Sequence, residues 1–178
     1  MATNASSSDY VFYLQGGANA CAHNQTLCVE ATSSTPLAFS EHEVIDAAGG
    51  LLSGDPPHLY STFNRVLVPY CSMDMFLLDT QPAEGQLQFR GRQLLEETLS
   101  VVLSTAPEGA SVVLAGSTAG GVGAFNAASW VLDTFDQVAE LSVIVDSAFL
   151  FDVSGFAAPF LEYLQQNPSA AYSSSCSE

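Results

Sequence analysis

Short apolar runs alternate along the chain with stretches that have helical spacing. Four runs are rich in β-branched and aromatic residues and end at Gly, Pro or an acid, as buried strands do: Tyr10–Leu14, Arg65–Tyr70, Ser111–Gly116 and Leu141–Asp146. The third run is apolar over most of its length, which is typical of a parallel strand covered on both faces.

The clearest helix is expected from Arg90 to about Ala106, because its regularly spaced apolar residues share one face: Leu95, Leu99, Val102 and Leu103. Three further helices are expected at Ser40–Gly49, Gly120–Leu132 and Gly155–Gln166. Residues 18–39 are small and polar and are predicted to form a long loop. Gln86–Phe89 is predicted to be a short strand or an extended loop.

This alternation predicts an α/β fold, with a mostly parallel sheet flanked by helices and right-handed crossovers. The length of 178 residues suits one domain, and there is no internal repeat or linker. Residues 1–8 and 169–178 are small, polar and low in complexity, so we expect them to be disordered.

The charge excludes several classes of partner. Nineteen acidic residues stand against three Arg and no Lys, for a net charge of −16. Because phosphate backbones and anionic lipids are bound by clustered basic residues, we expect no nucleic-acid partner and no adhesion to anionic lipid. No apolar run is long enough to span a membrane, and Met1–Ser8 lacks the basic and apolar regions of a signal peptide.

The cysteines are too scattered to form a metal site. Cys21, Cys28, Cys71 and Cys176 lack the spacing of zinc ligands, so we expect no metal and no other cofactor. Cys21 and Cys28 could form a disulfide in an oxidising compartment, and free thiols are the alternative. Two N-x-S/T triplets, at Asn4 and Asn24, would suit a secreted protein.

The glycine-rich turn Gly116–Gly121 is the candidate for chemistry. It follows an apolar strand and opens a helix, as the nucleophile elbow G-x-S-x-G does. In such an elbow the central side chain points into a cleft, and the next amide helps to bind an oxyanion. Here the central residue is Thr118, and Ser117 is one residue out of register. A β-branched residue tolerates a strained backbone poorly and a secondary alcohol is hindered, so we expect Thr118 to be inactive.

Other interpretations of this turn fit less well. A P-loop needs a Lys, which the chain lacks, and a dinucleotide-binding turn needs a third Gly where Asn126 stands. A tight packing turn between strand and helix, without chemistry, is the remaining alternative.

Ordered stretches around this turn resemble the pectinacetylesterase/Notum family of carboxylesterases. The stretches are Tyr10–Gly17 with two cysteines after it, Val66–Asp74, Phe89–Gly91 and Val113–Gly123, with Asp146-Ser147 following. The resemblance covers residues 10 to about 152. It implies the N-terminal half of an α/β-hydrolase that is secreted and acts on acyl esters, such as acetylated polysaccharide or a lipid acyl group.

The resemblance also implies roles for single residues. The family's elbow Ser maps onto Thr118, and its oxyanion-hole amides map onto Gly17, Ala18 and Ala119. Its triad Asp and His lie further towards the C-terminus and have no counterpart in this chain. We therefore expect a chain that is incomplete at its C-terminus and inactive in this form.

The remaining polar candidates are weaker. His23, His42 and His58 all precede the turn, and we expect them to be surface residues because nothing places them at the nucleophile position. Asp146 ends a strand and either contacts substrate or caps a helix; we take it and Ser117 as candidate substrate-binding residues.

The sequence leaves three interpretations. The first is a carboxylic ester hydrolase that has lost activity. The second is a non-catalytic module that binds an acyl or glycan ligand in the same cleft, and the third is a remnant without function.

Overall fold

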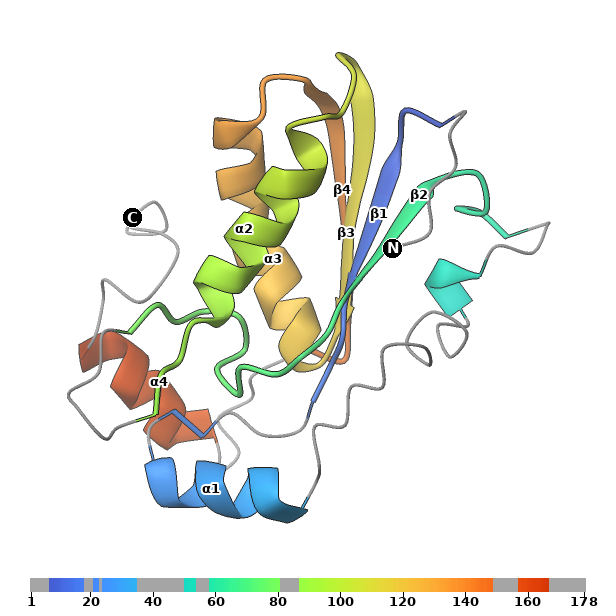
Figure 1. Cartoon of the computed structure of the whole chain (residues 1–178). Coiled ribbons are helices and arrows are strands. Elements are labelled where there is room, and N and C mark those ends of the chain that lie inside the picture. Colours follow the sequence, from blue (N-terminus) through green and yellow to red (C-terminus); the bar gives the residue numbers. More distant parts are fainter. Residues whose placement is uncertain are drawn as a thin grey trace.

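The computed structural model describes residues 7–17, 21–22, 24–34, 50–53, 58–80, 87–148 and 157–166. Its elements are β1 (Tyr10–Leu14), α1 (Gln25–Ser34), a 3₁₀ turn η1 (Gly50–Leu52), β2 (Asn64–Val68), α2 (Gly91–Leu103), β3 (Ala110–Ser117), α3 (Ala119–Thr134), β4 (Val138–Asp146) and α4 (Ala157–Gln166). Helices α2 and α3 lie along one side of the sheet, whereas α1 and α4 lie beyond one end of the strands (Figure 1).

The four strands form one sheet in the order β2-β1-β3-β4, and every neighbouring pair is parallel. The register pairs Leu14 with Gly116 and Ser117 with Asp146. Parallel pairing requires crossover connections, which α2 and α3 supply on one face. The predicted α/β class, with a mostly parallel sheet flanked by helices, is confirmed.

Alternation along the central strands divides the core into two parts. The larger part lies between the sheet and helices α2 and α3, and includes Phe12, Leu14 and Leu114. The smaller part lies on the other face and contains Val11 and Val113. Strands buried on both faces need apolar residues at successive positions, which explains the continuous apolar runs in the sequence.

Most predicted elements agree with the structure to within a few residues. The predicted apolar face of α2 is buried, with Leu95, Leu99 and Leu103 fully enclosed. Strand β2 ends at Val68, directly before Pro69, which has no N–H to offer a neighbouring strand. Residues 87–90 have no regular structure and are therefore an extended loop.

The prediction of a long loop over residues 18–39 was wrong, because α1 begins at Gln25 within that stretch. The Asn24 side-chain oxygen accepts hydrogen bonds from the backbone N–H groups of Thr26 (3.1 Å) and Leu27 (3.5 Å), as an N-cap residue does. A disulfide between Cys21 and Cys28 ties the first turns of the helix to the preceding chain. Cap and disulfide outweigh the low helix propensity of a Ser- and Thr-rich segment.

Several predictions lie outside the described residues: the helix at Ser40–Gly49 and most of the two ends, 1–8 and 169–178, that were expected to be disordered. No helix within the described ranges is long and apolar enough to cross a membrane.

Candidate active site

The candidate residues gather at the carboxyl ends of the parallel strands. Thr118 follows β3 directly, and Gly16 and Gly17 follow the neighbouring strand β1. Asp146 ends β4 on the other side of β3, and its backbone oxygen accepts a hydrogen bond from the Thr118 N–H at 2.9 Å. In open parallel sheets, ligands bind in the crevice at this edge.

Thr118 has a strained backbone. Its φ of 49° and ψ of −117° place a β-branched residue in a region that is almost reserved for glycine. The Thr118 side chain is exposed and forms no capping hydrogen bond with α3, although the residue stands at the N-cap position. The hydroxyl is therefore free of the structural role that Thr usually has at the start of a helix.

Glycines allow the chain to pack closely around Thr118. A Cβ atom on Gly16 would collide with the Thr118 hydroxyl, and one on Gly116 would lie 2.7 Å from the Gly121 nitrogen. A Cβ on Gly120 would lie 2.6 Å from the carbonyl carbon of Leu14. Strand β3, the turn and helix α3 therefore approach β1 more closely than any side chain would permit.

Ser117 and Asp146 flank the turn. The Ser117 hydroxyl accepts a hydrogen bond from the Tyr13 hydroxyl at 3.1 Å, so Tyr13 holds it beside β1. Asp146 is exposed, and its carboxylate accepts a hydrogen bond from the Ser147 hydroxyl at 3.0 Å. Both side chains are at the site edge, where they are candidates for contact with a ligand.

The candidate oxyanion donors come from two elements. Gly17 is partly buried in the loop after β1, and Ala119 is the buried first residue of α3. The N–H groups in the first turn of a helix have no partner within it, and the helix dipole favours negative charge there. Ala18, the third predicted donor, lies outside the described residues.

The described part of the chain places no base beside the Thr118 hydroxyl. His23 and His42 lie outside it, and His58 stands in the turn that leads into β2, at the amino ends of the strands. The described residues also contain no group of three or more His, Cys, Asp or Glu that could hold a metal ion.

A buried carboxylate near the site was not singled out in the sequence. Asp74 is fully buried in the turn that follows β2, and its carboxylate accepts hydrogen bonds from the backbone N–H groups of Phe76 at 3.0 Å and Gly91 at 2.7 Å. Burial raises the pKa of this carboxyl to about 6, although these hydrogen bonds oppose the shift. The sequence signal for such a residue is an acid shortly after an apolar run, as Asp74 is in Val66–Asp74.

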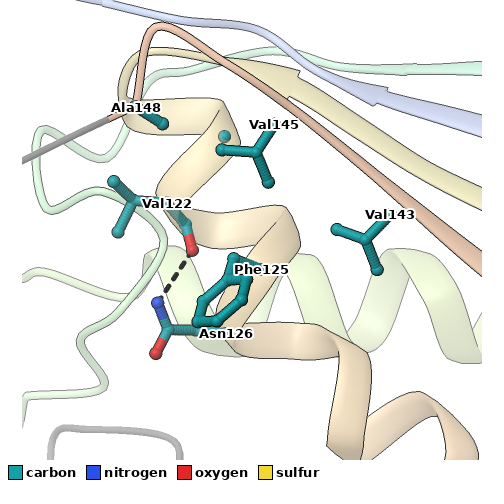
Figure 2. Close-up of a pocket in the computed structure, with 7 residues that line it drawn as sticks. Val122, Phe125, Asn126, Val143, Val145 and Ala148 are labelled. Atoms are coloured by element: carbon teal, nitrogen blue, oxygen red, sulfur yellow. Dashed lines mark hydrogen bonds between the residues drawn. The ribbon is translucent and has the colours of Figure 1, made fainter.

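An apolar groove lies between α3 and β4 and does not include Thr118. It has a volume of about 560 Å³. Figure 2 shows Phe125 on α3 facing Val143 and Val145 on β4. These three side chains are more than a third exposed, and β4 is the edge strand of the described sheet. The groove is therefore an open apolar surface beside the candidate site.

The parallel sheet and its strand–turn–helix junction are those of the α/β-hydrolase fold. The pectinacetylesterase family model matches residues 2–164, so the chain belongs to the pectinacetylesterase family.

Two relatives of this chain are named as carboxylesterases. The chain is 36% identical over 97 residues to palmitoleoyl-protein carboxylesterase NOTUM of Mus musculus, covering 52% of this chain and 18% of that protein. It is 28% identical over 152 residues to palmitoleoyl-protein carboxylesterase notum2 of Xenopus laevis, covering 80% of this chain and 31% of that protein. The chain thus spans less than a third of the length of these relatives.

Two solved structures share the fold. The Wnt deacylase Notum from Drosophila, in crystal form I, superposes with a TM-score of 0.65 at 17% identity, covering 93% of this chain and 56% of that chain. Crystal form II superposes with a TM-score of 0.61 at 22% identity, covering 80% and 44%. At these identities the likeness concerns the fold.

Proposed function

We propose that this chain forms the nucleophile and oxyanion half of a carboxylic ester hydrolase site. The observation that carries the proposal is the strained backbone of Thr118 at the junction of β3 and α3. A β-branched residue costs of order 1–3 kcal/mol in such a conformation, and strain of this kind gathers at functional sites. The turn is thus a nucleophile elbow with Thr118 at its centre.

The donors around the elbow define what it binds. Ala119 opens α3 and Gly17 follows β1, and amides at these places suit the carboxylate of a product or the oxyanion of an acyl-transfer intermediate. The family and its relatives support an acyl ester as the substrate class. The Cys21–Cys28 disulfide supports an oxidising compartment outside the cell.

Turnover requires a base that takes the proton from the Thr118 hydroxyl. Because the described residues place none there, we propose that the chain binds an acyl ligand without hydrolysing its ester. Acetylated polysaccharide and lipid-acyl esters are the two candidate substrates.

Hydrolysis of p-nitrophenyl octanoate tests the catalytic part of this proposal. We expect the wild-type chain and the Thr118→Ala variant to have the same rate, and Thr118→Ser to gain no activity, because the described residues position no base beside residue 118. Thr134→Ala, which removes an exposed Thr at the other end of α3, is the matched control. A wild-type rate above that of Thr118→Ala would show that a base is present and Thr118 is a working nucleophile.

Binding of octanoate tests the oxyanion part. In ¹H–¹⁵N spectra, octanoate is expected to shift the Gly17 and Ala119 amide resonances, because its carboxylate accepts hydrogen bonds from those N–H groups. Unchanged resonances at saturating octanoate would overturn the assignment of the oxyanion hole.

The groove between α3 and β4 favours a second candidate, a module that binds a long acyl chain without the elbow. Phe125→Ser removes a large apolar wall, and we expect it to weaken laurate binding by about tenfold, since a buried Phe contributes roughly 1.5–3 kcal/mol. Leu132→Ser is the control, because Leu132 is exposed on α3 but does not line the groove. Equal laurate affinity in both variants and the wild type, measured by calorimetry, would rule out the groove.

A further inference from the structure

The turn after β2 has an unusual backbone. Met73, Met75 and Phe76 all have positive φ, at 53°, 57° and 60°. Each costs about 1–2 kcal/mol relative to the usual right-handed conformation, so other interactions must hold the turn in place. Those interactions converge on the side chain of Asp74.

Asp74 connects this turn to helix α2. One carboxylate oxygen accepts hydrogen bonds from the Ser72 hydroxyl and the Phe76 N–H, and the other accepts from the Gly91 N–H at 2.7 Å. Gly91 is the first residue of α2, whose N-cap residue Arg90 makes no side-chain capping bond. A Cβ on Gly91 would lie 2.7 Å from the Asp74 carboxyl carbon, so glycine is what lets the carboxylate cap the helix.

The chain after β2 also forms hydrogen bonds with residues on either side of Gly17. Before Gly17, the Tyr70 N–H donates to the Gln15 side-chain oxygen at 3.3 Å. After Gly17, the Cys21 N–H donates to the Met73 backbone oxygen at 3.1 Å.

Between these two hydrogen bonds, the ring of Tyr70 covers Gly17. A Cβ on Gly17 would lie 2.8 Å from the Cε1 atom of Tyr70. The Tyr70 hydroxyl in turn accepts a hydrogen bond from the Met75 N–H at 3.0 Å, which joins the ring to the strained turn. Phe76 packs against the Tyr70 ring, with 5.2 Å between the ring centres, and a Cβ on Gly123 of α3 would lie 2.8 Å from the Phe76 Cβ.

We propose that Asp74 is the positioning residue of the oxyanion hole: its buried carboxylate fixes the turn Met73–Phe76, and the turn fixes Gly17 through Tyr70 and the Met73 carbonyl. This inference rests on the proposed function, since Gly17 is the oxyanion donor. Ala119 opens α3 and takes no part in these hydrogen bonds, and the turn meets α3 further along, where Phe76 packs against Gly123. Asp74 therefore acts more strongly on the Gly17 side of the oxyanion hole than on the Ala119 side.

The Asp74→Asn variant tests this division. An amide has only one acceptor oxygen, so one of the two N–H groups at Phe76 and Gly91 loses its partner. In the full chain, we expect the octanoate-induced shift of the Gly17 amide to be lost and that of Ala119 to remain. Leu103→Ala, a core change at the far end of α2, is the control for general destabilisation. Loss of both shifts, or retention of both, in Asp74→Asn would overturn the proposal.

Hydrogen exchange gives a readout that does not depend on octanoate. We expect the Cys21 and Met75 amides to exchange about tenfold faster in Asp74→Asn than in Leu103→Ala, since both are bonded to the released segment. If Asp74→Asn does not fold, Ser72→Ala removes one hydrogen bond from the same carboxylate and is expected to show a smaller change of the same kind. If the Cys21 and Met75 amides exchanged at the same rate in Asp74→Asn, Ser72→Ala and Leu103→Ala, positioning by Asp74 would be refuted. Absence of octanoate shifts in the wild type would instead refute only the proposed function.

Discussion

Replacement of Gly120 by Ala is expected to lower the free energy of unfolding by about 3 kcal/mol or more, the upper part of the range for overpacked sites. The added Cβ would lie 2.6 Å from the Leu14 carbonyl carbon and 2.8 Å from the Gln15 oxygen. Both atoms belong to backbone at the end of a central strand, so neither can rotate away as a side chain would. Helix α3 would have to move away from β1, which would also displace Thr118 from the Gly16 loop.

Gly109→Ala is the matched control for this prediction. Gly109 has a positive φ of 86°, but a Cβ there would meet nothing within 4 Å. Only the conformational penalty of a positive φ remains, so we expect the free energy of unfolding to fall by about 1 kcal/mol. Urea unfolding followed by circular dichroism measures both variants. A Gly120→Ala variant as stable as Gly109→Ala would contradict the close packing of α3 against β1.

The second large effect is a dependence of stability on pH that comes from Asp74. Burial raises the pKa of this carboxyl from 3.8 to about 6 in the folded protein. The folded state therefore binds the proton more tightly than the unfolded state, and stability falls as pH rises from about 4 to about 6. A rise in pKa of this size corresponds to a decrease of about 3 kcal/mol in the free energy of unfolding.

Two ionisable groups beside Asp74, those of Tyr70 and Cys71, do not titrate in this range. Burial raises the pKa of the Tyr70 phenol and of the Cys71 thiol, so both stay neutral below pH 7. Burial also raises the pKa of Glu96 on α2, which adds a smaller loss in the same direction because that side chain is partly exposed. The Asp74 contribution is isolated by a comparison with Asp74→Asn.

Urea unfolding at about pH 4 and about pH 7 checks this prediction. The Asn variant loses hydrogen bonds at both pH values, but it has no carboxyl to ionise. The difference in stability between wild type and variant is therefore expected to be about 3 kcal/mol smaller at the higher pH. A difference that does not change with pH would show that Asp74 keeps an ordinary pKa in the fold.

Periodicity and turn chemistry in the sequence determined the class of fold. Continuous apolar runs such as Ser111–Gly116 are what two-sided burial demands, and the helices between them require parallel strands. The glycine spacing around Thr118 also predicted a junction between a strand and a helix, and β3 and α3 meet there. Each of these features is local, so a single chain carries enough information to reveal it.

Periodicity and propensity failed where particular side-chain contacts decide, some of them near in the chain and others distant. Helix α1 forms in a segment of low helix propensity because a disulfide and the Asn24 cap stabilise it. Asp74 looked like any acid after a strand, since its hydrogen-bond donor Gly91 is 17 residues away and meets it only in the folded chain.

The sequence by itself therefore determined the α/β class, the family resemblance and the residue at the centre of the glycine-rich turn. Tertiary structure alone decided the strained conformation of Thr118, the burial of Asp74 and the covering of Gly17 by Tyr70. The physical reason is that propensity and periodicity act between neighbours in the chain. Strain, desolvation and close backbone approach depend instead on segments that folding brings together.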